Sequence, residues 1–184
     1  CPLTPLTADM PVALVIANSQ YENQTLRQSV SDANAMDNAL KKLDFRVIFK
    51  TELNKKAMTQ AVAELSHCLK ITGGVGLFYF SGYGVQVNAE NYLLPINADI
   101  KDEIDVEFDA FPVNKILTRL KKSQNALNIL ILDASRDNPD LPVSKRGLAS
   151  ISAPNGFFIG YPTGLGQTVV EDTRATNSLY IRAL

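Results

Sequence analysis

Two hydroxyl side chains, Tyr83 and Ser135, each follow an apolar run that is typical of a buried strand. The carboxyl ends of parallel strands meet at one edge of a sheet, where such sheets bind ligands, so we expect both residues to border one polar crevice. A serine hydroxyl becomes a useful nucleophile when a base removes its proton during attack. Tyr83 is a poor base, because a phenol with a pKa of about 10 is almost fully protonated at pH 7 and then donates a hydrogen bond.

The elements that must position these two residues alternate along the chain. Apolar strand-like runs and segments of helical period follow one another, a pattern that predicts an α/β sandwich with a mainly parallel sheet. The expected strands are 11–18, 45–50, 75–81, 127–134 and 156–161, with a short hairpin formed by 85–87 and 92–94. Helices are expected after a cap at Ser29 or Ser31, after the cap Asn54, at Pro112 and near Asn177. We expect residues 100–109, 138–154 and 163–176 to be irregular.

Composition limits the kind of protein. With 184 residues, 46% of them hydrophobic, and a formal net charge of −1, the chain is expected to form one globular domain. This charge gives no reason to expect nucleic acid or an anionic membrane as a partner, and no apolar run is long enough to span a bilayer. Because the chain opens at Cys1 and not at Met, we expect an excised piece whose targeting signal lies outside it, and we favour a cytoplasmic location.

Neither cysteine nor histidine chemistry is indicated. Two cysteines make no disulfide framework, and Cys68 falls on the apolar stripe of a helix, so we expect a small buried side chain. His67 is the single histidine, and it points to the polar flank of the same helix. No cluster of cysteine and histidine has zinc spacing.

Several motifs, in order along the chain, resemble the caspase-like (peptidase C14) family in its bacterial metacaspase-like (orthocaspase) branch. The matching segments are 13–18, 31–33, 77–82, 91–95, 131–134 with 136–139, 146–149, 153–154 and 177–180. The resemblance implies a caspase-like three-layer sandwich with about six strands in the central sheet and helices on both faces. It divides the chain into an extension at 1–10 and one domain at 11–184, itself made of a large-subunit-like part 11–140, a linker loop 141–154 and a small-subunit-like part 155–184 that is expected to be truncated.

The resemblance also assigns roles to individual residues. Family members hydrolyse amides with a cysteine thiolate activated by histidine, and they select Arg or Lys through acidic pocket residues. The histidine position falls on Tyr83, the cysteine position on Ser135 and the two acidic positions on Asp32 and Asp133. Gly84 falls near the backbone that stabilises the oxyanion.

The two departures predict loss of peptidase activity. A thiol with a pKa of about 8.5 is a few per cent thiolate at neutral pH, whereas an alcohol ionises about seven powers of ten less readily. Losing one member of a catalytic triad lowers turnover about a million-fold. Rescue of Ser135 by His67, or by a Tyr83 phenolate stabilised by Arg136, is the alternative within the chain. An active enzyme inactivated by designed substitution is a further alternative.

The acidic positions favour a binding module. With the catalytic histidine and cysteine (the dyad) absent, Asp32 and Asp133 could hold an Arg or Lys side chain of a peptide or protein partner without cleavage. The structural alternative is that Asp32 caps a helix and Asp133 anchors a loop. Lys145 and Arg146 in the linker are where active relatives tend to cleave themselves, and here we expect the linker to stay intact. A vestigial crevice on a scaffold is an equally open interpretation.

Other site chemistries have less support. Some family members need calcium, but the acidic stretch from Asp99 to Asp109 lacks the EF-hand pattern, so we expect a solvated loop and no cofactor. An unrelated doubly wound nucleotide-binding domain is the third class of function considered. It would rest on Gly82-Tyr83-Gly84 alone, and no third glycine opens a helix after it.

Overall fold

A five-stranded parallel sheet forms the centre of the domain. The computed structural model describes residues 1, 5–22, 25–135, 147–164, 166–169 and 174–184. The strands are β1 (Val12–Ala17), β2 (Arg46–Thr51), β3 (Val75–Ser81), β7 (Leu127–Asp133) and β8 (Phe157–Gly160), in the order β2-β1-β3-β7-β8. Every pairing in this sheet is parallel. The predicted mainly parallel sheet is confirmed, with five strands in the described residues where about six were expected.

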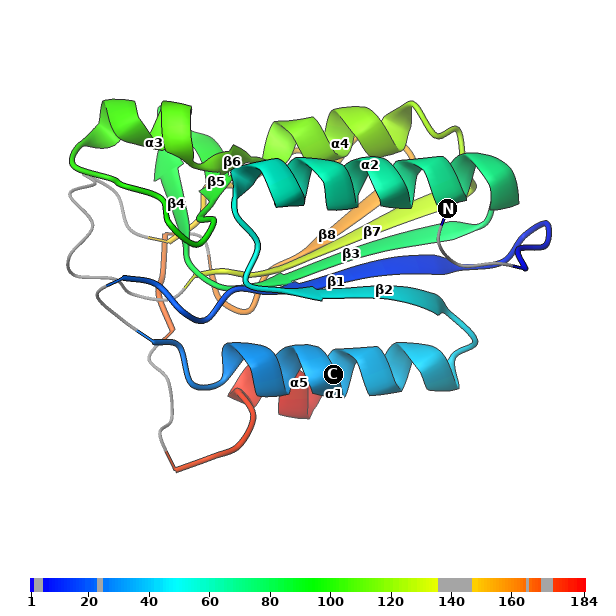
Figure 1. The fold of residues 1–184 in the computed structure, drawn as a ribbon, viewed down its shortest axis with the longest axis horizontal. Coiled ribbons are helices and arrows are strands. Elements are labelled where there is room, and N and C mark those ends of the chain that lie inside the picture. Colours follow the sequence, from blue (N-terminus) through cyan, green and yellow to red (C-terminus); the bar gives the residue numbers. More distant parts are fainter. Residues whose placement is uncertain (2–4, 23–24, 136–146, 165, 170–173) are drawn as a thin grey trace.

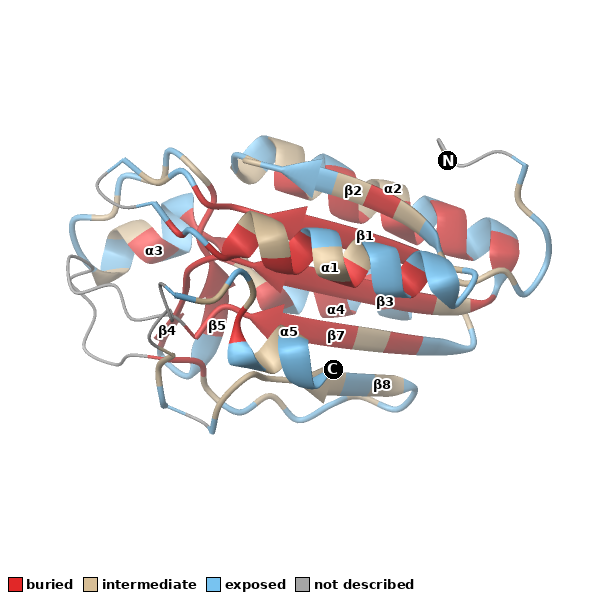
Figure 2. Cartoon of the chain, turned by 90° about the horizontal axis from the view of Figure 1, so that it is seen from below, coloured by how far each residue is buried: buried red, intermediate tan, exposed pale blue. Residues whose placement is uncertain are grey.

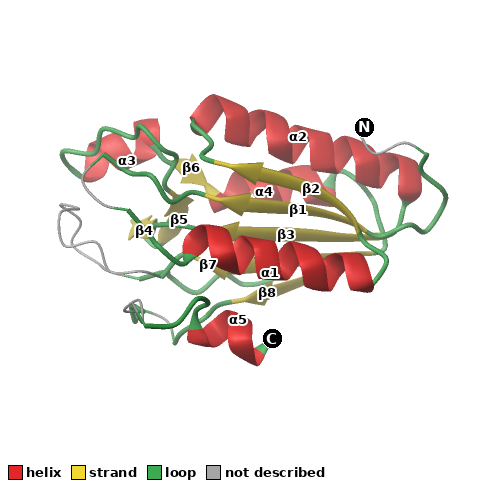
Figure 3. Cartoon of the chain, turned by 60° about the horizontal axis from the view of Figure 1, so that its bottom comes forward, coloured by secondary structure: helices red, strands yellow, loops and turns green. Residues whose placement is uncertain are grey.

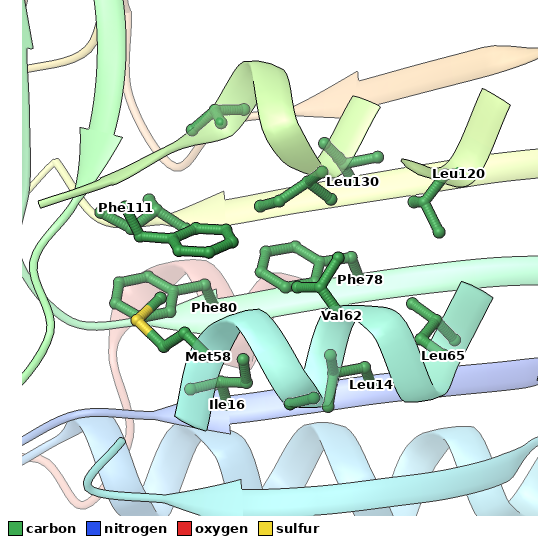
Figure 4. Packing of buried hydrophobic residues seen from close by; sticks show 14 of the residues in the cluster. Leu14, Ile16, Met58, Val62, Leu65, Phe78, Phe80, Phe111, Leu120 and Leu130 are labelled. Carbon is green, nitrogen blue, oxygen red and sulfur yellow. The ribbon is translucent and has the colours of Figure 1, made fainter. Parts of the chain in front are cut away.

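Helices cover both faces of this sheet (Figure 1). On one face lie α2 (Lys55–Thr72) and α4 (Val113–Lys121), and on the other lie α1 (Ser29–Lys42) and the short α5 (Leu179–Ala183). The close view in Figure 4 shows Leu14, Ile16, Phe78 and Phe80 of the sheet packed against the α2 side. Alternate residues of the same strands pack with α1 in a second cluster. Burial on both faces explains why β1 and β3 are apolar throughout.

The helices largely follow the predicted apolar stripes. The apolar stripe of α2 is buried, and it consists of Met58, Ala61, Val62, Leu65 and Leu69. Asn54 caps this helix through its side chain, which accepts a hydrogen bond from the Ala57 N–H at 2.9 Å. The predicted serine cap of α1 is wrong, because Gln28 occupies the cap position and makes no capping bond with its side chain. No helix in the described parts of the chain combines the length and apolar character needed to cross a membrane.

A small antiparallel sheet extends from the carboxyl ends of the central strands (Figure 3). It consists of β4 (Gly84–Val87), β5 (Glu90–Leu93) and β6 (Phe111–Pro112), so the predicted hairpin is confirmed. The prediction that residues 100–109 are irregular is wrong, because Glu103–Asp109 forms helix α3. A capping box explains its start: Asp102 accepts hydrogen bonds from the N–H groups of Ile104 and Asp105, and the Asp105 carboxylate accepts one from the Asp102 N–H.

A disulfide joins Cys1 to Cys68 on α2. Cys68 is fully buried, as predicted, but the expectation of an unbonded side chain is wrong. The Asp9 N–H donates a hydrogen bond to the Thr72 carbonyl at 2.8 Å, so the segment before β1 also contacts the end of α2.

Candidate functional site

Tyr83 and Ser135 meet at the carboxyl edge of the central sheet. Strands β3 and β7 are neighbours in register, with Ser81 opposite Asp133. Two residues beyond that pair, Tyr83 and Ser135 face each other in an isolated antiparallel bridge. The order of the strands therefore brings together the two residues that the sequence singled out, at the edge where it placed them.

The Tyr83 side chain is a packing residue of the small sheet. It is only 2% exposed and belongs to an apolar cluster with Leu26, Val85 and Val106. Its ring lies against that of Tyr21, with centroids 4.8 Å apart and planes inclined by 55°. The Tyr83 ring therefore contributes to the packing of this edge.

Tyr21 is a member of the site that the sequence analysis missed. Its hydroxyl oxygen accepts a hydrogen bond from the Tyr83 N–H at 3.1 Å, and the hydroxyl donates one to the Leu94 carbonyl at 3.2 Å. Tyr21 thus ties the loop after β1 to the segment after β3 and to the end of the hairpin. The available signal was an aromatic residue just beyond the carboxyl end of another central strand.

Ser135 and Gly84 lie where two backbones pass closely. Ser135 is 2% exposed, and its carbonyl accepts a hydrogen bond from the Val169 N–H at 2.8 Å. A side chain at Gly84 would place its Cβ 2.9 Å from both the Cβ and the carbonyl oxygen of Ala134. Glycine is therefore required at position 84 by the approach of β4 to the segment that carries Ser135.

Asp32 holds the C-terminal segment against α1. The carboxylate is fully buried, and its Oδ1 accepts hydrogen bonds from the Ser178 N–H at 2.8 Å and from Nδ2 of Asn177 at 3.1 Å. Two neighbours on the same turn act alike, because Gln28 Nε2 donates to the Ala175 carbonyl and Ser31 Oγ to the Thr176 carbonyl. The start of α1 is therefore a clamp for residues 175–178.

Asp133 lies on the same side of the sheet. Its Oδ2 accepts hydrogen bonds from the Tyr79 hydroxyl at 3.0 Å and the Ser81 hydroxyl at 3.4 Å, and the residue is 2% exposed. Burial raises the pKa of Tyr180 on α5, and the negative charge of Asp133 raises that pKa further. The two acidic positions thus border the contact between the sheet, the start of α1 and the C-terminal segment.

The remaining sequence candidates do not join this group. His67 is exposed in the last turns of α2, which lead into the start of β3, at the opposite end of the sheet from Ser135. Lys145, Arg146 and Arg136 lie outside the described residues. Within the acidic stretch, Asp99 forms an ion pair with Lys101 at 2.8 Å. Over the described residues, no group of three or more His, Cys, Asp or Glu side chains could hold a metal ion.

Comparisons with known proteins agree with this architecture. A family model, the caspase domain, matches residues 10–184. The chain is 26% identical over 183 residues to the mucosa-associated lymphoid tissue lymphoma translocation protein 1 of Homo sapiens. The aligned region covers 98% of this chain and 22% of that protein. The homolog of Mus musculus gives the same identity, with 21% of its length covered. The chain thus spans about a fifth of the curated relatives it matches.

A solved structure shares the fold. The Drosophila initiator caspase Dronc superposes with a TM-score of 0.59 at 12% identity, over 85% of this chain and 57% of that chain. At this level of identity the likeness concerns the arrangement of strands and helices. It confirms the caspase-like α/β fold predicted from the sequence.

Proposed function

The chain belongs to the caspase domain family, and we propose that it is a caspase-fold module that binds protein or basic-peptide partners without cleaving them. We also propose that it belongs to the bacterial metacaspase-like branch, on the motifs given above. The observation that supports the loss of cleavage is the burial of Tyr83, whose ring falls at the base position and packs against the tilted ring of Tyr21.

Proton availability is the chemical argument for this proposal. Ser135 needs a base within hydrogen-bonding reach to become a nucleophile. A phenol with its ordinary pKa is protonated at neutral pH, and His67 lies at the other end of the sheet. We assign Gly84 to the oxyanion-stabilising backbone on the family resemblance, and such a segment without an activated nucleophile performs little hydrolysis.

Peptide hydrolysis assays test the loss of activity. With fluorogenic peptides ending in Arg or Lys, we expect no turnover above buffer from the native chain, since loss of a single triad member already lowers turnover about a million-fold. Ser135→Ala is the matched control for contaminating peptidases, and Tyr83→His with Ser135→Cys restores the family's dyad. Native turnover that Ser135→Ala abolishes would establish an active hydrolase with Tyr/Ser chemistry and overturn the proposal. Turnover seen only after the double reversion supports it.

The acidic pocket supplies the binding part of the proposal. Asp32 serves as the clamp for the C-terminal segment, so the carboxylate that we assign to the incoming guanidinium or ammonium is that of Asp133. Its Oδ2 accepts hydrogen bonds from two neutral groups, the Tyr79 and Ser81 hydroxyls. A cation that displaces them would gain a charge-assisted hydrogen bond.

Binding of a non-cleavable Arg peptide tests this assignment. A hydrogen bond to a charged group contributes about 1.5–3 kcal/mol, so we expect Asp133→Asn to weaken the affinity about 10- to 100-fold. Tyr79→Phe is the matched control, because it removes a donor to the same oxygen and keeps the charge. The same peptide with citrulline in place of Arg should bind as weakly to the native chain. An unchanged affinity for Asp133→Asn would contradict the pocket and leave the hydrolysis test unaffected.

A further inference from the structure

A groove runs along the exposed side of α4, and it has a volume of about 630 Å³. Figure 1 shows α4 on the face of the sheet that α2 also covers. The groove is lined by residues of β5, β6 and α4 and by the residue that follows α4, and they are Glu90, Pro112, Asn114, Lys115, Thr118, Arg119 and Lys122. None of them belongs to the Tyr83–Ser135 edge or to the two acidic positions.

Three cations line one side of this groove. Lys115, Arg119 and Lys122 are exposed, and no ion pair within the described chain neutralises any of them. Positions spaced four and three residues apart lie on one helix face, so the charges follow one another over about 10 Å of helix. This regular spacing exceeds what favourable interaction with the helix dipole explains, since that effect is confined to the last turn.

The helix that carries these three cations is packed firmly against the core. The opposite side of α4 buries Val113, Ile116, Leu117 and Leu120 in the core. The hydroxyl oxygens of Ser66 on α2 and Ser123 after α4 lie 2.9 Å apart, and each is within hydrogen-bonding distance of the Arg119 carbonyl oxygen, at 3.2 and 3.3 Å. The backbone that carries Arg119 is therefore fixed before any ligand arrives.

Lys55 is a fourth cation near the groove. Lys55 of α2 donates a hydrogen bond to the Phe108 carbonyl. Burial lowers the pKa of Lys55, the charge of Lys115 lowers it further, and the nearby Asp109 raises it. Lys55 and Lys115 thus lie close enough to interact, and an anionic ligand would relieve their repulsion.

The position of Glu90 favours an acidic peptide over a nucleic acid as the ligand of this groove. It is exposed and lies in the groove, where its Oε2 accepts a hydrogen bond from the Tyr92 hydroxyl at 3.4 Å. The acidic helix α3 follows nearby, because Ala110 alone separates it from β6. A continuous phosphate backbone would be repelled by Glu90 and α3. A peptide can place carboxylates on the three cations and offer an N–H group to Glu90.

We propose that this groove binds an acidic segment of a partner protein, with its carboxylates on Lys115, Arg119 and Lys122 and a backbone N–H on Glu90. In an extended peptide, side chains on one face recur about every 7 Å, so two or three carboxylates cover the span of the cations. The recognised segment is therefore one with Asp or Glu at alternate positions. This site is separate from the proposed pocket for basic side chains.

Fluorescence anisotropy with a labelled decapeptide of alternating Glu and Ser tests the proposal. We expect saturable binding that weakens at least tenfold in Lys115→Gln with Arg119→Gln and also weakens as salt is raised. The matched control is Lys42→Gln with Lys121→Gln, which removes the same charge from exposed positions outside the groove. This control should bind as the native chain does.

Four results would overturn the proposal. They are no saturable binding, an equal loss of affinity in both double variants, an oligonucleotide of equal length that binds through the groove as tightly as the peptide, and a self-association of this chain that the groove variants abolish. Because the substituted residues are exposed, the variants should keep the native melting temperature. Failure here leaves the assays of the catalytic and acidic positions untouched.

Discussion

Reduction of the Cys1–Cys68 disulfide should lower the free energy of unfolding by about 3–4 kcal/mol, because the bond closes a long loop in the unfolded chain. The two cysteines are 67 positions apart, so the cross-link restricts more than a third of the chain. A loss of this size is a large part of the total stability of a typical domain. Urea unfolding with and without a thiol reductant would measure it.

Two variants separate the bond from the packing around it. Cys1→Ser removes the cross-link while the Cys68 side chain stays buried, so it should reproduce the effect of the reductant. Cys68→Ala also leaves a small void and should cost somewhat more. Neither variant should respond to the reductant. A native chain whose unfolding is the same in both buffers would contradict the expectation, as would an intact mass that retains two free thiols.

Local pattern predicted most of the central architecture. The runs of β1 and β3 are apolar without interruption because helices cover both faces of the sheet, and α2 is buried along the stripe that its sequence shows. These signals depend on neighbours in the sequence. Once the strands were placed, the common position of Tyr83 and Ser135 followed from the rule that parallel strands end at one edge.

The missed features are contacts between distant segments or weak local signals. The bond between Cys1 and Cys68 depends on the path of the first ten residues, which no periodicity describes. The Asp32 clamp joins positions 146 apart and depends on how α5 docks. Helix α3 has seven residues and is dominated by acidic side chains, so its period is obscured. The spacing of Asp102 and Asp105 was the one local sign of it.

Burial also changed the interpretation of the base position. The sequence presented Tyr83 as a hydrogen-bond donor facing a polar crevice. Figure 2 shows the carboxyl edge of the central sheet as largely buried chain, and the ring of Tyr83 is part of that packing. The exchange of imidazole for phenol therefore affects the stability of this edge as well as its proton chemistry.

Replacing Tyr83 by alanine should destabilise the domain by about 3–5 kcal/mol, the range for deleting a buried aromatic ring. The loss of the tilted ring contact with Tyr21 adds to the loss of buried area. Tyr83→Phe keeps the ring and should cost about 1 kcal/mol, the net value of one hydrogen bond. Phe158→Ala is the control for aromatic loss at the surface, because Phe158 is 60% exposed, and it should change stability little.

Unfolding of a third Tyr83 variant tests whether tyrosine is natural at this position. Tyr83→His puts a smaller, polar ring into an apolar cluster, so we expect a loss between those of the Phe and Ala variants. That order would mean that the surrounding residues are adapted to tyrosine, as in a natural pseudoenzyme. A histidine variant more stable than the native chain would instead indicate a cavity shaped for imidazole. It would then favour an enzyme inactivated by substitution over the module proposed above.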